Sequence, residues 1–197
     1  MTDAGAKGAA FFDLDKTIIA TTSSGAFSGP LYRGGLVTRS RALKAALAQF
    51  LFLVGSADEN QTARLRDALS ELVSGWSVED VRRIGAETVH ESVDPIVYRE
   101  ALGLIQRHKA NGRDVIIVSA SPRDLVQPIA DALGATGVIA SELEVVDGLY
   151  TGAVTFYCFG EAKAQAVRDL AADRGIALDH SYAYSDSITD VPMLSAV

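Results

Sequence analysis

Short apolar runs alternate with helical patterns along the second half of this chain, and this alternation limits the fold more than any other feature. Residues 114–119 (Asp-Val-Ile-Ile-Val-Ser) are mostly β-branched and apolar, which is typical of a parallel strand buried on both faces. A helical pattern over 125–133 follows and ends at Gly134, and a short strand is predicted over 137–141. Parallel strands separated by helices predict a doubly wound α/β sheet.

Four more elements extend this pattern. An apolar run over 9–15 (Ala-Ala-Phe-Phe-Asp-Leu-Asp) predicts a buried first strand that ends in acids. Asp147-Gly148 within 143–154 predicts a hairpin with a tight turn. A helix is expected over 161–174, ended by Gly175, and a last strand over 180–185.

The region between the first and second strands is predicted to hold helices and no strand. We expect a loop over 21–35 and helices over 38–54, 59–73 and 77–93, the last with a capping box formed by Ser77 and Asp80. A further helix is expected to start at Asp94-Pro95, run to about Lys109 and stop at Asn111-Gly112. The predicted domains are therefore a core, residues 1–20 plus 94–197, and an inserted all-helical cap, residues 21–93.

Composition excludes several classes of protein. The 197 residues carry 18 Lys+Arg and 25 Asp+Glu, a net charge of −7, without a basic cluster for nucleic acid. The longest apolar stretch, 42–54, is shorter than the roughly 20 residues that cross a bilayer, so no transmembrane segment is expected. A single cysteine, Cys158, predicts a buried thiol and a cytoplasmic location.

Reactive side chains follow the ends of the predicted strands. Asp13 and Asp15 end the first strand, Ser119 ends the second, Lys163 begins the helix after the hairpin, and Asp186 follows the last strand. Because the carboxyl ends of parallel strands meet at one edge of a sheet, we expect these groups to converge.

Three carboxylates in a small space repel one another unless a cation shares them, and oxygen ligands suit Mg²⁺. A lysine, a serine hydroxyl and the N–H groups of a helix start would hold phosphate oxygens. The pattern therefore favours phosphoryl transfer through an aspartyl-phosphate.

The same residues, in the same order, resemble the four motifs of the haloacid dehalogenase superfamily. The resemblance rests on residues 11–17 (Phe-Phe-Asp-Leu-Asp-Lys-Thr), on Val118-Ser119, on Lys163 and on residues 185–190 (Ser-Asp-Ser-Ile-Thr-Asp). It covers essentially the whole chain and is to the phosphoserine-phosphatase-like branch, which carries a helical cap after the first strand of a Rossmann-like core.

The resemblance implies a role for each position. Asp13 would be the nucleophile, and Asp15 the general acid and base. Mg²⁺ would be held by the Asp13 carboxylate, the Asp15 backbone carbonyl and Asp186.

Four further positions are implied to support these groups. Ser119 and Lys163 would bind the phosphoryl oxygens, and Thr17 would hydrogen-bond near the nucleophile within the phosphate site. Asp190 would orient Lys163 or a metal-bound water, or complete a capping box with Ser187.

Two other assignments of these residues, to cation pumps and to the dehalogenase branch, do not fit the sequence. Asp15-Lys16-Thr17 is similar to the phosphorylated motif of cation pumps, but that frame places Ile19 where a threonine is required and no membrane helices follow. The dehalogenase branch lacks the second aspartate. Ser121 is predicted to be a helix N-cap.

The sequence thus predicts a Mg²⁺-dependent phosphatase acting on a small phosphorylated metabolite. A phosphotransferase, and a weakly active phosphate-binding or regulatory domain of a longer protein, remain alternatives. Phosphoserine itself is in doubt as substrate, since Thr22 stands where the branch carries a glutamate. The chain ends soon after Asp186, which we interpret as a truncation whose exposed last strand would favour a homodimer.

Overall fold

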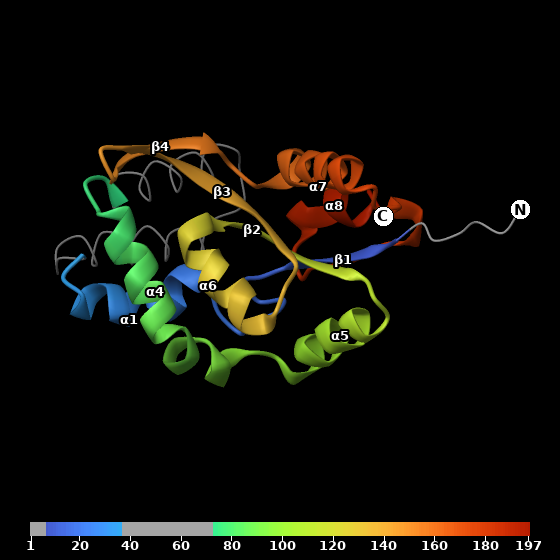
Figure 1. Cartoon of the computed structure of the whole chain (residues 1–197), viewed down its shortest axis with the longest axis horizontal. Helices are drawn as coiled ribbons and strands as arrows, with labels where there is room; N and C mark the ends of the chain where they lie inside the picture. Colours follow the sequence, from blue (N-terminus) through green and yellow to red (C-terminus); the bar gives the residue numbers. More distant parts are fainter. Residues whose placement is uncertain (1–6, 37–72) are drawn as a thin grey trace, which may run out of the picture.

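A five-stranded, mostly parallel sheet forms the centre of the fold (Figure 1). The computed structural model describes residues 7–36 and 73–197. The strands are β1 (Ala9–Asp13), β2 (Asp114–Pro122), β3 (Gly137–Val146), β4 (Leu149–Phe156) and β5 (Tyr182–Tyr184). They lie in the order β4-β3-β2-β1-β5, and only β4 pairs antiparallel to its neighbour. The predicted α/β fold is confirmed.

Helices cover both faces of this sheet, as a doubly wound fold requires (Figure 1). The α-helices are α1 (Ser23–Arg33), α4 (Val78–Ser92), α5 (Arg99–Ala110), α6 (Arg123–Leu133), α7 (Gly160–Arg174) and α8 (Val191–Leu194). The short 3₁₀ helices are η1 (Asp94–Ile96), η2 (Leu178–His180) and η3 (Ile188–Asp190). Helices α7 and α8 pack on one face, and α1, α4, α5 and α6 pack on the other.

Alternate residues of β1 pack against opposite faces of the sheet. Phe11 packs in the cluster with Val167 of α7 and Met193 of α8, whereas Phe12 packs in the cluster with Ile105 of α5 and Ile129 of α6. All six side chains are almost fully buried. The strand must therefore be apolar at every position, which is why its sequence shows no alternation.

Several predicted ends of elements are confirmed. Gly134 and Gly175 close α6 and α7 in the left-handed region, each with φ 64°. Asp147 (φ 51°) and Gly148 (φ 77°) form the turn between β3 and β4. The Ser77 hydroxyl accepts a hydrogen bond from the Asp80 N–H and caps α4.

The expected loop over 21–35 is wrong, because this stretch contains α1. The Thr22 side chain accepts a hydrogen bond from the Gly25 N–H and caps the helix. Pro30 lies inside the helix, and its side chain is buried with Phe27. Glycines and a proline made the stretch look like a loop, and packing against the core outweighs their low helix propensity.

The helix expected from Asp94 also differs. Asp94 begins only η1, and α5 starts at Arg99. Between them the chain is extended, because Ile19 and Val97 form an antiparallel bridge. Helix α5 ends at Ala110, and Asn111 is its C-cap, as predicted.

Two strands also begin or end at other residues than predicted. β3 is continuous through Glu142, where its partner changes from β2 to β4, and β5 is shorter than the predicted 180–185. Within the described ranges β5 pairs only with β1, so it lies at an edge. Association through this edge remains a prediction.

The inserted region is described only in part. The helices predicted over 38–54 and over most of 59–73 lie outside the described residues. Helices α1 and α4 share one apolar cluster with α6, and Arg82 of α4 pairs with Asp124 of α6 at 2.6 Å. The division into a core and a cap remains a prediction. No helix among residues 7–36 and 73–197 is long and apolar enough to cross a membrane.

Gly8 shows how closely β1 approaches the chain before β5. A Cβ atom at Gly8 would lie 2.1 Å from the His180 carbonyl oxygen, whereas one at Gly103, exposed on α5, would meet nothing within 4 Å. We expect Gly8→Ala to lower the free energy of unfolding by about 1–3 kcal/mol. Gly103→Ala should raise it by up to about 1 kcal/mol. Urea denaturation measures both, and equal effects would contradict the packing described here.

Candidate active site

The carboxyl ends of three neighbouring strands bring the predicted reactive groups together. Asp13 ends β1 and is paired in register with Val118 of β2, which Ser119 follows. On the other side, β1 pairs with β5, and Ser185 and Asp186 come directly after that strand. Parallel pairing on both sides of β1 therefore places these residues at one edge of the sheet.

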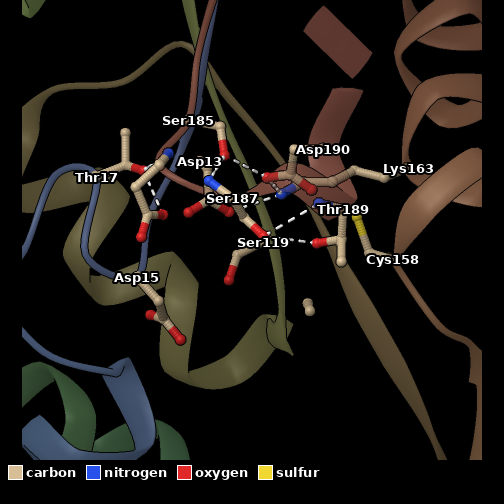
Figure 2. Close-up of polar contacts among 12 residues, drawn as sticks. Asp13, Asp15, Thr17, Ser119, Cys158, Lys163, Ser185, Ser187, Thr189 and Asp190 are labelled. Carbon is tan, nitrogen blue, oxygen red and sulfur yellow. Dashed lines mark hydrogen bonds and ion pairs between the residues drawn. The ribbon is translucent and has the colours of Figure 1, made fainter. Parts of the chain in front are cut away.

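Lys163, in the first turn of α7, lies between two carboxylates (Figure 2). Its ammonium donates to Asp13 Oδ1 at 2.6 Å and to Asp190 Oδ2 at 2.7 Å. Lys163 is 2% exposed, Asp190 3% and Asp13 8%. One buried cation thus serves two buried anions, which leaves this group of three with a formal charge of −1 when all are ionised.

Burial and ion pairing act against each other in this group. Burial raises the pKa of Asp13 to about 6, although the Lys163 ammonium partly offsets this effect. Burial alone would lower the pKa of Lys163, but Asp13 and Asp190 outweigh it and raise that pKa. Lys163 is therefore held as a cation next to the predicted nucleophile.

Asp190 contacts Lys163 directly. Its Oδ2 atom accepts hydrogen bonds from Lys163 and, at 2.7 Å, from the Ser185 hydroxyl. The alternative capping box is not formed, since the Ser187 N–H donates to Ser185 Oγ. Ser187 itself caps η3 by accepting from the Thr189 N–H.

Thr17 contacts Asp186 instead of the predicted nucleophile. Its hydroxyl donates to Asp186 Oδ1 at 3.2 Å and accepts from the Asp186 N–H at 3.0 Å. The side chain thus joins the turn after β1 to the turn after β5. The structure shows no hydrogen bond between Thr17 and Asp13. The role of Thr17 in the phosphate site therefore remains a prediction.

The carboxyl group of Asp15 points away from Lys163 and toward the start of α1 (Figure 2). Its Oδ1 atom accepts from the Ser23 N–H at 2.8 Å, and its Oδ2 atom accepts from the Ser121 hydroxyl at 3.3 Å. Burial raises the pKa of Asp15, while the bonds from Ser23 and Ser121 act to lower it. The predicted N-cap role of Ser121 is wrong, since Pro122 is the N-cap of α6 and makes no side-chain bond.

Ser119 is buried at the end of β2. It is 1% exposed, and its Oγ atom accepts a hydrogen bond from the Ser121 N–H at 3.1 Å. That bond leaves the Ser119 hydroxyl proton available to a ligand at this edge of the sheet.

The candidate metal ligands at this edge are all oxygen atoms, the type of ligand that Mg²⁺ prefers. Asp186 is exposed, and only its Oδ1 atom is bonded to Thr17. In the described part of the chain no three His, Cys, Asp or Glu side chains are grouped to hold a metal, so the expected cluster of three carboxylates does not form. The set of Asp13 and Asp186 carboxylates with the Asp15 carbonyl is compatible with this result.

Comparison with known proteins identifies the family. A model of haloacid dehalogenase-like hydrolases matches residues 10–195. The chain belongs to this family. It is therefore an enzyme of a hydrolase family.

Two curated relatives of this hydrolase come from Mycobacterium tuberculosis. A protein described as a probable phosphatase is 56% identical over 192 residues, which are 98% of this chain and 67% of the relative. A phosphoserine phosphatase is 36% identical over 191 residues, which are 96% of this chain and 62% of the relative. The chain thus spans about two thirds of the length of these relatives.

A solved structure confirms the fold. A protein of unknown function from Bordetella pertussis Tohama I superimposes with a TM-score of 0.83 at 28% identity, covering 98% of this chain and 88% of that one.

Sequence reasoning missed three serines that line the site. Ser23 and Ser121 contact Asp15, and Ser185 contacts Asp190. Ser185 lies one position before Asp186, and Ser121 lies two positions after Ser119. Their closeness in sequence to predicted site residues could have indicated them. Ser23 had none, because it lies in the stretch interpreted as a loop.

One histidine lies in the core. His108 is buried on α5, where its Nε2 atom contacts the Tyr184 hydroxyl at 2.8 Å. Its ring meets Phe12 edge-on. It is a core residue on the face of the sheet that α5 covers. Cys158 is buried as predicted.

Proposed function

We propose that this hydrolase is a Mg²⁺-dependent phosphatase that cleaves a small phosphate monoester through an aspartyl-phosphate on Asp13. The observation that carries the proposal is the buried lysine: Lys163 contacts Asp13 at 2.6 Å and is held in place by Asp190. A lysine is almost never fully buried unless it is paired, and one partner of this lysine is the predicted nucleophile. The curated relatives described as phosphatases support the same activity.

The first step transfers the phosphoryl group to the protein. A carboxylate oxygen of Asp13 forms a bond to phosphorus while the ester O–P bond breaks, and the Asp15 carboxyl group gives its proton to the leaving oxygen. In the second step Asp15 takes a proton from water, whose oxygen forms a bond to phosphorus as the bond to Asp13 breaks. The products are the alcohol and inorganic phosphate, and both aspartates return to their starting states.

Lys163 and Ser119 would bind and orient the phosphoryl oxygens in both steps. The ammonium carries charge into a buried edge, where electrostatic interactions are stronger than in water. Asp13, Asp186 and the Asp15 carbonyl would hold Mg²⁺, which when bound supplies positive charge against the repulsion between phosphate and carboxylates.

The identity of the ester is proposed only as a class. Thr22, where a substrate-binding glutamate is expected for phosphoserine, is the N-cap of α1. We therefore expect a phosphorylated metabolite other than phosphoserine, hydrolysed in the cytoplasm. A panel that includes phosphoserine and histidinol phosphate tests this, and phosphoserine as the best substrate would contradict it.

Removal of metal should stop the reaction. We expect EDTA to abolish release of inorganic phosphate from p-nitrophenyl phosphate and added Mg²⁺ to restore it, because the acidic edge repels phosphate without a cation. A thermal melt in EDTA is the control that the protein stays folded. Full turnover in EDTA would contradict metal dependence, and phosphate transfer to an added alcohol would identify a phosphotransferase.

A further inference from the structure

Two serine hydroxyls form a short chain of hydrogen bonds that ends on Asp15. Ser23 Oγ donates to Ser121 Oγ at 2.6 Å, and Ser121 Oγ donates to Asp15 Oδ2 at 3.3 Å. The Ser23 backbone N–H donates to Asp15 Oδ1 at 2.8 Å. Both oxygens of the carboxyl group are thus engaged, which fixes the rotation of the side chain.

The two serines come from different parts of the fold. Ser23 is the first residue of α1 and is fully buried, and Ser121 lies near the end of β2, two residues after Ser119. Ser121 also donates its N–H to Ser119 Oγ. Asp15 is therefore held between the start of α1 and the strand end that carries the predicted phosphate ligand.

The orientation suits proton transfer to a leaving group. In-line attack places the leaving oxygen on the side of phosphorus opposite Asp13. Figure 2 shows the Asp15 carboxyl group apart from the ion pairs of Lys163, on the side of α1. The group that donates the proton thus lies apart from the groups that hold the phosphoryl oxygens.

We propose that Ser121, supported by Ser23, is a positioning residue that aims the Asp15 carboxyl group at the leaving oxygen of the ester. This inference rests on the proposed phosphatase function. Without Ser121, Asp15 Oδ2 loses a donor and the buried Ser23 hydroxyl loses its acceptor. Asp15 can then rotate away from the position from which it protonates the ester.

Leaving groups of different basicity test this role. The p-nitrophenolate ion leaves without a proton, whereas an alkoxide needs one, so aiming of the acid matters only for the alkyl ester. We expect Ser121→Ala to lower kcat/KM for n-propyl phosphate by about 10- to 100-fold and for p-nitrophenyl phosphate by less than about 3-fold. The ratio kcat/KM is used because it reports steps up to phosphoryl transfer and excludes the later hydrolysis, in which Asp15 serves both esters alike.

Ser28→Ala is the matched control, because within the described part of the chain the hydroxyl of this exposed serine of α1 bonds only the Gly25 carbonyl, at 2.7 Å. Ser28→Ala should leave kcat/KM unchanged for both n-propyl phosphate and p-nitrophenyl phosphate. Ser121→Thr, which keeps the hydroxyl, should restore most of the n-propyl phosphate activity. Should Ser121→Ala fold poorly, Ser23→Ala is expected to give the same selective loss in weaker form.

The outcomes separate the two proposals. A wild-type protein that hydrolyses neither ester would overturn the proposed function, and this inference with it. A wild-type protein that hydrolyses both, with Ser121→Ala lowering both in the same proportion or neither, would overturn the positioning role alone.

Discussion

Replacement of Asp13 by asparagine is expected to reduce phosphatase turnover by at least about 10³-fold, the largest effect on activity that the site predicts. Asparagine keeps the size of the side chain but supplies no carboxylate oxygen to attack phosphorus. Lys163 would retain Asp190 as its partner, so the buried ammonium is not left unpaired. Release of phosphate from p-nitrophenyl phosphate in Mg²⁺ measures the effect.

The control for Asp13→Asn is Asp131→Asn, which changes an exposed residue near the end of α6 whose carboxylate accepts a hydrogen bond from Gln127 and from no other residue that the structure describes. It should keep full turnover. Mass spectrometry of acid-quenched protein should also find a phosphorylated species in the wild type and none in Asp13→Asn. Normal turnover by Asp13→Asn would mean that the phosphoryl group is not carried on this residue.

Replacement of Lys163 by alanine is expected to have the largest effect on stability. Two buried carboxylates, Asp13 and Asp190, would lose their shared cation, and breaking a buried pair in this way costs about 3–5 kcal/mol. The loss should shrink as the pH falls through about 6, because burial raises the pKa of Asp13 to about 6 and protonation of this carboxylate removes part of the uncompensated charge. Urea denaturation at several pH values measures it, and turnover should be lost as well.

Two further variants separate charge from packing. Lys163→Met with Asp190→Asn removes one positive and one negative charge together, so it should recover part of the stability but none of the activity. Arg168→Ala, on the same helix, breaks an exposed pair with Glu161 and should cost less than about 1 kcal/mol. If Lys163→Ala were as stable as Arg168→Ala, the buried ion pairs would not hold this edge together.

Much of the fold could be predicted, because the deciding signals are local. β-branched residues filled the central strands, and glycines with positive φ ended α6 and α7. The errors at α1 and before α5 have another cause. Packing of Phe27 and the bridge between Ile19 and Val97 are long-range contacts, and no local pattern reports them.

The site was predicted in its residues but less well in its contacts. Asp13, Lys163 and Asp190 are grouped because parallel pairing and the start of α7 place them at one edge, which topology alone could indicate. The rotation of Asp15 could not be predicted. β1 ends at Asp13, so the alternation of side chains along an extended strand no longer applies two residues later.

The bridge between Ile19 and Val97 has a consequence for the length of chain that can stand between these two residues. The Ala20 N–H donates to the Ile96 carbonyl at 2.8 Å, and the Tyr98 N–H donates to the Ile18 carbonyl at 2.8 Å. The point where the chain leaves the sheet is thus tied to the point where it returns. When the two ends of a flexible loop are fixed next to each other, doubling the length of the loop costs only about 0.6 kcal/mol of closure entropy. Changes in the length of the chain between these two points therefore need not alter the register of the strand ends that carry the chemistry.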